Sequence, residues 1–143
     1  MNPQESGLDG TIEHLFNKAA FIRDLGIKLK DLGSGTCETL LEILPRHLQQ
    51  DDVIHAGVMA TMADHTAGAA GASLVKKGEI VLTIEFKINI LRPACGQSLR
   101  CKATVLRPGS RVTIAESEVF SREGEKEVMV AKAMVTLAVV AAP

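Results

Sequence analysis

Residues 55–65, HAGVMATMADH, combine polar side chains with small neighbours in a pattern that could support chemistry. The segment leads from a polar stretch into a run of small residues with the length of a helix. Unpaired N–H groups at a helix start favour negative charge. Ala56 and Gly57 would offer such groups without bulky side chains. They could therefore stabilise an oxyanion that develops on an ester or thioester carbonyl.

Asp64 lies inside this run of apolar and small residues. A carboxylate in that setting is costly unless it is exposed, paired or functional. It could act as a general base toward water or as a nucleophile. It could equally be a structural carboxylate on a solvated helix face, and the residues alone leave both interpretations open.

His55 and Asp64 are nine positions apart. On one helix this spacing corresponds to about 900° of rotation and roughly 13 Å along the axis, so the two side chains point to opposite sides. One chain does not easily bring both to one atom, whereas two subunits related by a two-fold axis could. The spacing therefore predicts a homodimer at least. His65 points about 100° away from Asp64, so we expect no dyad, and no metal-ligand spacing among the histidines predicts a metal site.

The composition excludes several classes of protein. A length of 143 residues fits one domain. Sixteen Lys and Arg against seventeen Asp and Glu give a net charge of −1, without the basic excess of a nucleic-acid-binding protein. The chain has no Trp, no Tyr and only four Phe, too few for a ladder of base-stacking platforms. We therefore expect no nucleic-acid partner.

Three cysteines, Cys37, Cys95 and Cys101, are too few and too widely spaced for a disulfide scaffold or a zinc site. They are typical of free thiols in a reducing compartment. The first ten residues lack the pattern of a secretory signal, and no apolar run reaches the ~18 residues of a membrane span. The expectation is a cytoplasmic protein with no membrane partner.

The hydrophobic periodicity predicts one α+β domain over residues 1–143. An apolar stripe predicts an amphipathic helix over residues 8–22 that ends before Gly26. A small-residue helix follows at 57–75, and its composition indicates very close packing. Alternating residues predict strands over 27–32, 36–44, 84–90, 98–105, from 112 with a phase slip near Ala115, and 129–140. The pattern favours an antiparallel sheet of five to six strands wrapped around one central Ala/Gly-rich helix.

The motif His55-Ala56-Gly57, followed by Asp64, resembles the helix-entry motif of hotdog-fold thioesterases. The likeness is to the phenylacetic-acid-degradation (PaaI-like) branch of the acyl-CoA thioesterase superfamily, whose pattern is His-Gly-Gly and then an Asp nine residues after the His. The strand that ends at Arg92-Pro93 is also similar to the family pattern. The resemblance covers residues 25–140, with residues 1–24 as an N-terminal extension and helix. Here Ala56 replaces the first Gly of the motif.

The resemblance implies hydrolysis of an acyl-CoA thioester to free acid and thiol, without a cofactor, at a subunit interface of a homodimer or homotetramer. In the family the residue after the His supplies the oxyanion N–H, here Ala56, and the Asp comes from the neighbouring subunit. Gln49 stands where the family often has Asn, and it would orient water or the leaving thiolate together with His55. Thr83 stands near a water-orienting Ser and keeps the hydroxyl.

Two alternatives belong to the same fold: a noncatalytic acyl-CoA-binding module, and a hydratase or dehydratase. The retained Asp64 favours an enzyme, and the chain lacks the Asp-x-Asn-Pro-x-His run of hydratases. For substrate binding, Met59 and its small neighbours predict an apolar pocket. Arg92, Arg107 and Arg111 flank strand ends and could meet the phosphates of coenzyme A. Aryl, medium-chain and short-chain acyl groups are all compatible with this set.

Overall fold

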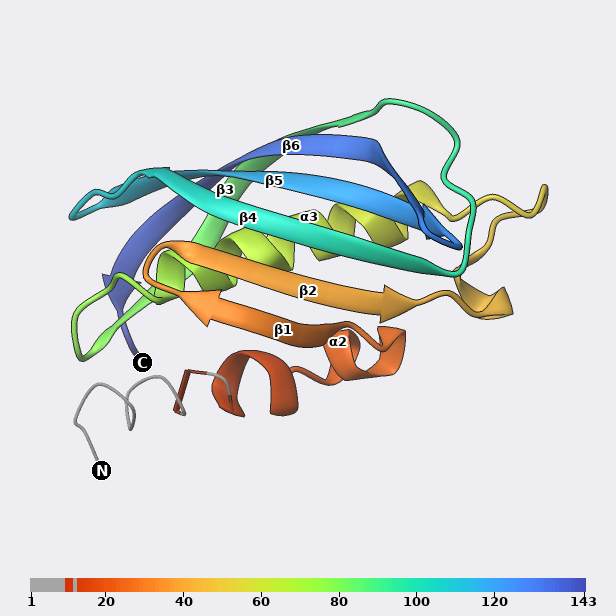
Figure 1. Cartoon of the computed structure of the whole chain (residues 1–143). Helices are drawn as coiled ribbons and strands as arrows, with labels where there is room; N and C mark the ends of the chain where they lie inside the picture. The colour runs from red at the N-terminus through yellow and green to blue at the C-terminus, as the bar shows by residue number, and fades with distance from the viewer. Residues whose placement is uncertain (1–9, 12) are drawn as a thin grey trace.

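The computed structural model describes residues 10, 11 and 13–143 of the chain. One antiparallel sheet of six strands, in the order β1-β2-β4-β5-β6-β3, curves around the long helix α3 (Ala56–Ala72) (Figure 1). The predicted α+β hotdog architecture is therefore confirmed. The strands are β1 (Lys28–Gly33), β2 (Thr36–Glu42), β3 (Glu79–Ile90), β4 (Ser98–Arg107), β5 (Val112–Glu123) and β6 (Lys126–Ala141).

The small residues of α3 allow the helix to lie directly against the sheet. Ala63, Ala67 and Ala70 are fully buried. A Cβ atom added to Gly71 would come within 2.5 Å of the Leu137 Cδ1 atom on β6, so only glycine allows this approach. Hydroxyl groups fill the remaining space between the layers; for example, Ser117 donates a 2.7 Å hydrogen bond to the Ala63 carbonyl. The expectation of a closely packed helix is confirmed.

Strand β5 differs from the sequence prediction. Its buried face consists of Thr113, Ala115, Ser117, Val119 and Ser121 in unbroken alternation, so the apolar Val112 and Ile114 lie on the other face. The irregularity near Ala115 exists, but the extra residue is in β4, where the register shifts between Val105 and Arg107. Strand β6 is paired on both sides, as its two apolar faces predicted.

The N-terminal segment is not the single helix that the apolar stripe predicted. A π-helical turn, η1 (Glu13–Asn17), is followed by a short helix, α2 (Ala20–Leu25), with an extended residue at Ala19 between them. Phe16 and Ile22 are both buried, and in one continuous helix they would point about 120° apart. The break therefore lets both side chains reach the core. Gly26 ends α2 with φ +91°, as expected, whereas Leu8 and Ile12 of the stripe lie outside the described residues.

The two edges of the sheet differ in chemistry. Strand β1 carries the exposed Lys28, Lys30 and Asp31, charges that discourage pairing with another strand. Strand β3 also has exposed charges, Glu85 and Lys87, but it adds exposed apolar side chains: Leu82 is 56%, Ile84 59% and Phe86 39% exposed. A bulge at Ile84 shifts the register of β3 against β6 between Thr83 and Glu85. Within the described residues, no helix is long and apolar enough to cross a membrane.

Candidate active site

The loop before α3 is held in place by a buried histidine. His47 belongs to a short 3₁₀ turn, η2 (Pro45–His47). Its Nδ1 atom accepts a 2.9 Å hydrogen bond from the Leu44 N–H, and its Nε2 atom donates one of 2.7 Å to the Leu25 carbonyl. The His47 carbonyl in turn accepts a 2.9 Å hydrogen bond from the His55 N–H. This histidine therefore fixes the start of α3, a role that its sequence neighbours did not indicate.

His55 caps α3 with its imidazole ring. Its Nδ1 atom accepts a 2.8 Å hydrogen bond from the Gly57 N–H. In a neutral ring the proton then sits on Nε2, which faces solvent as a donor. A Cβ atom on residue 57 would lie 2.9 Å from the Nδ1 atom of His55, so the capped geometry requires glycine.

Ala56 supplies the free N–H group at the helix start. The sequence predicted that the N–H groups of both Ala56 and Gly57 would be available, but His55 occupies that of Gly57. The Ala56 N–H occupies the first helical position and has no acceptor among residues 10, 11 and 13–143. It is exposed, so it can donate to an oxyanion from outside the protein.

Asp64 lies on the side of α3 that faces β3. The Thr83 hydroxyl donates a 2.7 Å hydrogen bond to the Asp64 Oδ1 atom. Within the described part of the chain the Oδ2 atom accepts no hydrogen bond, and Asp64 is half-buried beside the apolar β3 edge. The carboxylate is thus oriented by one oxygen and free to act through the other.

Asp64 and Ala56 do not meet within one chain. They are eight residues apart on α3, which places them roughly 12 Å apart along the helix axis. Gln49 belongs to the Ala56 end of the helix: its N–H donates to the Val53 carbonyl at 2.8 Å in the loop that leads to His55. Its side-chain amide makes no hydrogen bond with any described residue, so it can reach a ligand.

The residues expected to bind substrate are spread over the chain. Met59 is only 1% exposed and packs in the core. Arg92 follows β3 at the end of the sheet near Ala56. The hydrogen bond from the Ile54 N–H to the Ala94 carbonyl joins the two segments there. Arg92 lines a hollow of about 270 Å³ together with Lys126. Arg107 and Arg111 flank the β4–β5 turn at the opposite end of the sheet (Figure 1). One chain therefore does not bring the three arginines together, and Lys126 is a cation that the sequence did not single out.

His65 holds the N-terminal segment against α3. Its Nε2 atom donates a 2.9 Å hydrogen bond to the Leu15 carbonyl, and its ring meets that of Phe16 edge to face at 5.0 Å. Burial lowers the pKa of His65 from 6.5, although the hydrogen bond to Leu15 and the charge of Asp64 oppose this shift. His65 is thus engaged elsewhere and forms no dyad with Asp64.

Two of the cysteines, Cys37 and Cys101, are buried, whereas the exposed Cys95 lines the same hollow as Arg92. All three are free thiols, and burial raises the pKa of Cys37 and Cys101 from 9.0 to about 12, so both stay protonated. Among the described residues, no group of three His, Cys, Asp or Glu side chains could hold a metal ion.

Comparisons with known proteins show the family and the fold of the chain. Residues 52–128, more than half of the chain, match the Thioesterase superfamily. The crystal structure of a thioesterase family protein from Silicibacter pomeroyi is 28% identical, with a TM-score of 0.91 over 94% of this chain and 99% of that one. The 1,4-dihydroxy-2-naphthoyl-CoA hydrolase of Escherichia coli is 25% identical over 70% of this chain and 74% of its own length. The E. coli PaaI protein from the phenylacetic acid degradation operon shares the fold, with 18% identity and a TM-score of 0.83 over 94% of both chains.

Proposed function

Because the chain belongs to the Thioesterase superfamily, we propose that it hydrolyses an acyl-CoA thioester to a free acid and coenzyme A at a site shared by two subunits. The observation that carries this proposal is the hydrogen bond from Thr83 to one oxygen of Asp64. Among the described residues, it leaves the second oxygen of the carboxylate without a hydrogen bond at an open edge of the sheet.

The apolar β3 edge supports a two-fold dimer. Exposed apolar side chains at an unpaired strand edge favour pairing with another strand. If a two-fold axis perpendicular to the sheet passes through this edge, the α3 helices of the two subunits lie antiparallel to each other. The start of one α3 would then lie beside the middle of the other. This arrangement brings Ala56 of the partner subunit toward Asp64, which one chain cannot do. Two such dimers could form a homotetramer.

The chemistry then needs few groups. The Ala56 N–H binds the thioester oxygen and stabilises the charge that develops on it. The free oxygen of Asp64 takes a proton from water while the water oxygen attacks the carbonyl carbon. Alternatively, it attacks that carbon directly and forms a mixed anhydride, which water hydrolyses after the thiolate has left to give the free acid and restore the Asp64 carboxylate. The carbon–sulfur bond breaks, and the thiolate leaves and then takes up a proton. The His55 Nε2–H and the Gln49 amide lie at the Ala56 end, where they can orient the water or the thiolate.

Coenzyme A is the thiol we propose, because its phosphates are anions and the exposed Arg92, Arg107 and Arg111 offer cations at strand ends. Arg92 and Lys126 line one hollow at the Ala56 end of the sheet, together with one carboxylate, that of Glu123. The two-fold axis would carry Arg107 and Arg111 of the partner subunit to that same end of the dimer. The relative from E. coli is named as the hydrolase of an aryl-CoA, which agrees with this assignment. The free thiols fit the reducing cytoplasm, where we place the protein.

The test is turnover of a panel of aryl-, medium-chain and short-chain acyl-CoA substrates. Thiol release should be measured in a Cys95→Ser background, because the exposed Cys95 would itself react with a thiol reagent. Release of coenzyme A by this variant, lost on Asp64→Asn, supports the proposal. Tight binding of acyl-CoA without release would contradict it and indicate a binding module instead.

A further inference from the structure

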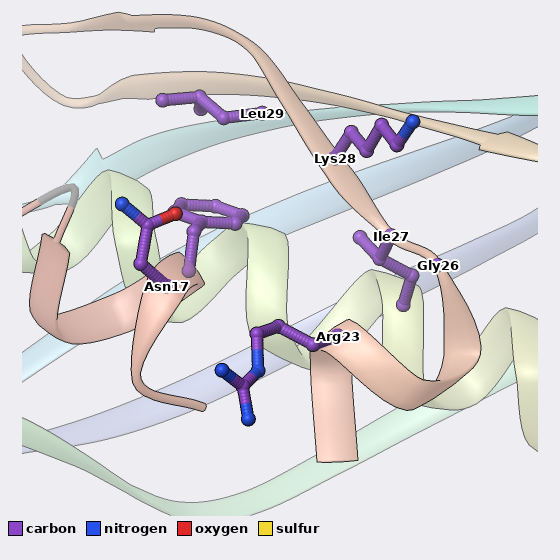
Figure 2. A pocket seen from close by; sticks show the side chains of 7 residues that line it. Asn17, Arg23, Gly26, Ile27, Lys28 and Leu29 are labelled. Atoms are coloured by element: carbon purple, nitrogen blue, oxygen red, sulfur yellow. The ribbon is translucent and has the colours of Figure 1, made fainter. Parts of the chain in front are cut away.

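A hollow of about 330 Å³ lies on the side of the molecule away from β3, between the N-terminal segment and the start of β1. Its floor is apolar and comes from two separate elements. Phe16 of η1 and Ile27 are buried, and Leu29 of β1 is half-buried. Figure 2 shows Asn17 and Arg23 on the N-terminal segment, across the hollow from Ile27.

The rim of the hollow is cationic. Arg23 and Lys28 line it, and neither forms an ion pair within the described part of the chain. A third cation, Arg46, lies nearby. Its Nη2 atom donates a 3.2 Å hydrogen bond to the Leu25 carbonyl, and a Cβ atom added to Gly26 would lie 3.3 Å from that same Nη2 atom. The neighbouring Asp24 does not line the hollow. Two cations, Arg23 and Lys28, therefore line the hollow, Arg46 lies next to the lining residue Gly26, and no carboxylate is among the lining residues.

We infer that this hollow binds a small carboxylic acid with an apolar body, at a site separate from Asp64. The apolar body would pack mainly on the half-buried Leu29 and touch the small exposed parts of Phe16 and Ile27. The carboxylate would meet the Arg23 guanidinium, whose planar fork matches two carboxylate oxygens, with Lys28 at the outer rim. The volume is near the lower end of the ~300–1,000 Å³ typical of ligand pockets, so it suits a small acid and not a whole coenzyme A thioester.

This site does not depend on the proposed hydrolysis, although the acid product of that reaction belongs to the same chemical class. The hollow is nevertheless linked to α3 through Phe16. The Phe16 ring that lines it also packs edge to face on His65, the neighbour of Asp64. An acid bound against Phe16 would therefore hold the N-terminal segment on α3 and raise the melting temperature of the protein.

The experiment titrates the full chain with octanoate and with phenylacetate by calorimetry, and it follows the methyl resonances of Ile27 and Leu29 by NMR. Both acids should bind and shift these methyl groups. Octan-1-ol lacks the charge and acetate lacks the apolar body, so both should bind more weakly. The double variant Arg23→Gln/Lys28→Gln should weaken octanoate binding roughly tenfold or more, since hydrogen bonds to charged groups are lost. The matched control Lys18→Gln/Lys77→Gln removes two exposed charges outside the hollow and should leave the affinity unchanged.

Three results would overturn the inference. The first is that neither acid binds at about 10 mM, which is about ten times a dissociation constant of 1 mM. The double variant binds octanoate as well as the wild type does. The methyl group of Thr83, the residue that contacts Asp64, shifts instead of those of Ile27 and Leu29, which would place the acid at the candidate active site. Because Asp64→Asn should retain full acid binding, failure of this inference and failure of the proposed hydrolysis can be told apart.

Discussion

The Thr83 hydroxyl on β3 donates a 2.7 Å hydrogen bond to the Asp64 carboxylate on α3, across 19 positions of sequence. This contact fixes one oxygen of the carboxylate and directs the other toward the open edge of the sheet. The hydroxyl does not itself take or give a proton in the proposed reaction, so Thr83 is a positioning residue.

Removing the Thr83 hydroxyl should therefore slow the reaction without weakening substrate binding. Thr83→Ala should lower kcat about tenfold and leave KM nearly unchanged. A tenfold change corresponds to about 1.4 kcal/mol, close to the smallest free energy that a hydrogen bond to a charged group contributes. Thr83→Ser keeps a hydroxyl and should restore most of the rate. Steady-state kinetics of the two variants make the comparison. Equal kcat values for Thr83→Ala and the wild type would show that the contact is only structural.

Gly57 should matter for activity through the ring of His55. A Cβ atom on residue 57 would push the imidazole away from its capping position, so Gly57→Ala should lower kcat. Stability should change little, because alanine favours the helix by about 1 kcal/mol while loss of the cap costs about 0.5–2 kcal/mol. In a His55→Ala background, Gly57→Ala should have no further effect on kcat, since the clashing ring is absent. Additive losses in the double variant would contradict this coupling.

The β3 edge should be the dimer interface. Ile84→Glu places a charge on the most exposed apolar side chain of this edge, so sedimentation should show a monomer with little hydrolytic activity. Phe21→Glu is the matched control, because Phe21 is 65% exposed on α2, away from β3. It should stay dimeric and active. A monomeric Ile84→Glu variant with the wild-type rate would rule out a shared site.

His65 should make stability depend on pH. Burial lowers its pKa in the folded state, so below pH 6.5 the unfolded chain binds the proton more readily than the folded chain does. The stability that neutral His65 contributes is therefore complete above pH 6.5 and is lost as the pH falls toward the lowered folded value. His65→Gln, whose amide can still donate to the Leu15 carbonyl, should show a smaller fall in melting temperature between pH 7 and pH 5. The exposed His14→Gln control should follow the wild type, and identical curves for wild type and His65→Gln would contradict this assignment.

Much of the site could be predicted because it depends on local sequence. The small residues around Asp64 indicated a helix under close packing, and the nine-residue separation from His55 indicated that one chain cannot join the two. By contrast, the hydrogen bond from His65 to Leu15 joins residues 50 positions apart, and no local pattern encodes it. The capping of α3 by His55 depends on a loop conformation that is held by the buried His47, which periodicity does not reveal.

The errors in the fold have the same origin. The apolar stripe at the N-terminus predicted one helix, but Phe16 and Ile22 must both reach the core and the helix breaks between them. In β3, alternation predicted a strand over 84–90, whereas the strand spans Glu79–Ile90 and lies at the edge of the sheet, with Ile84 and Phe86 exposed in the single chain. Position within the sheet depends on long-range pairing, which alternation alone does not determine.

The most direct test of the account is the activity of Asp64→Asn. This substitution keeps the shape of the side chain and its ability to accept the Thr83 hydrogen bond, but it removes the basic oxygen. If Asp64 acts on water, kcat for the best acyl-CoA substrate should fall by about 10²–10⁴, the usual contribution of general-base catalysis. KM should change much less, because the loss is confined to the transition state. Full activity in a folded, dimeric Asp64→Asn protein would contradict the account and make Asp64 a structural residue.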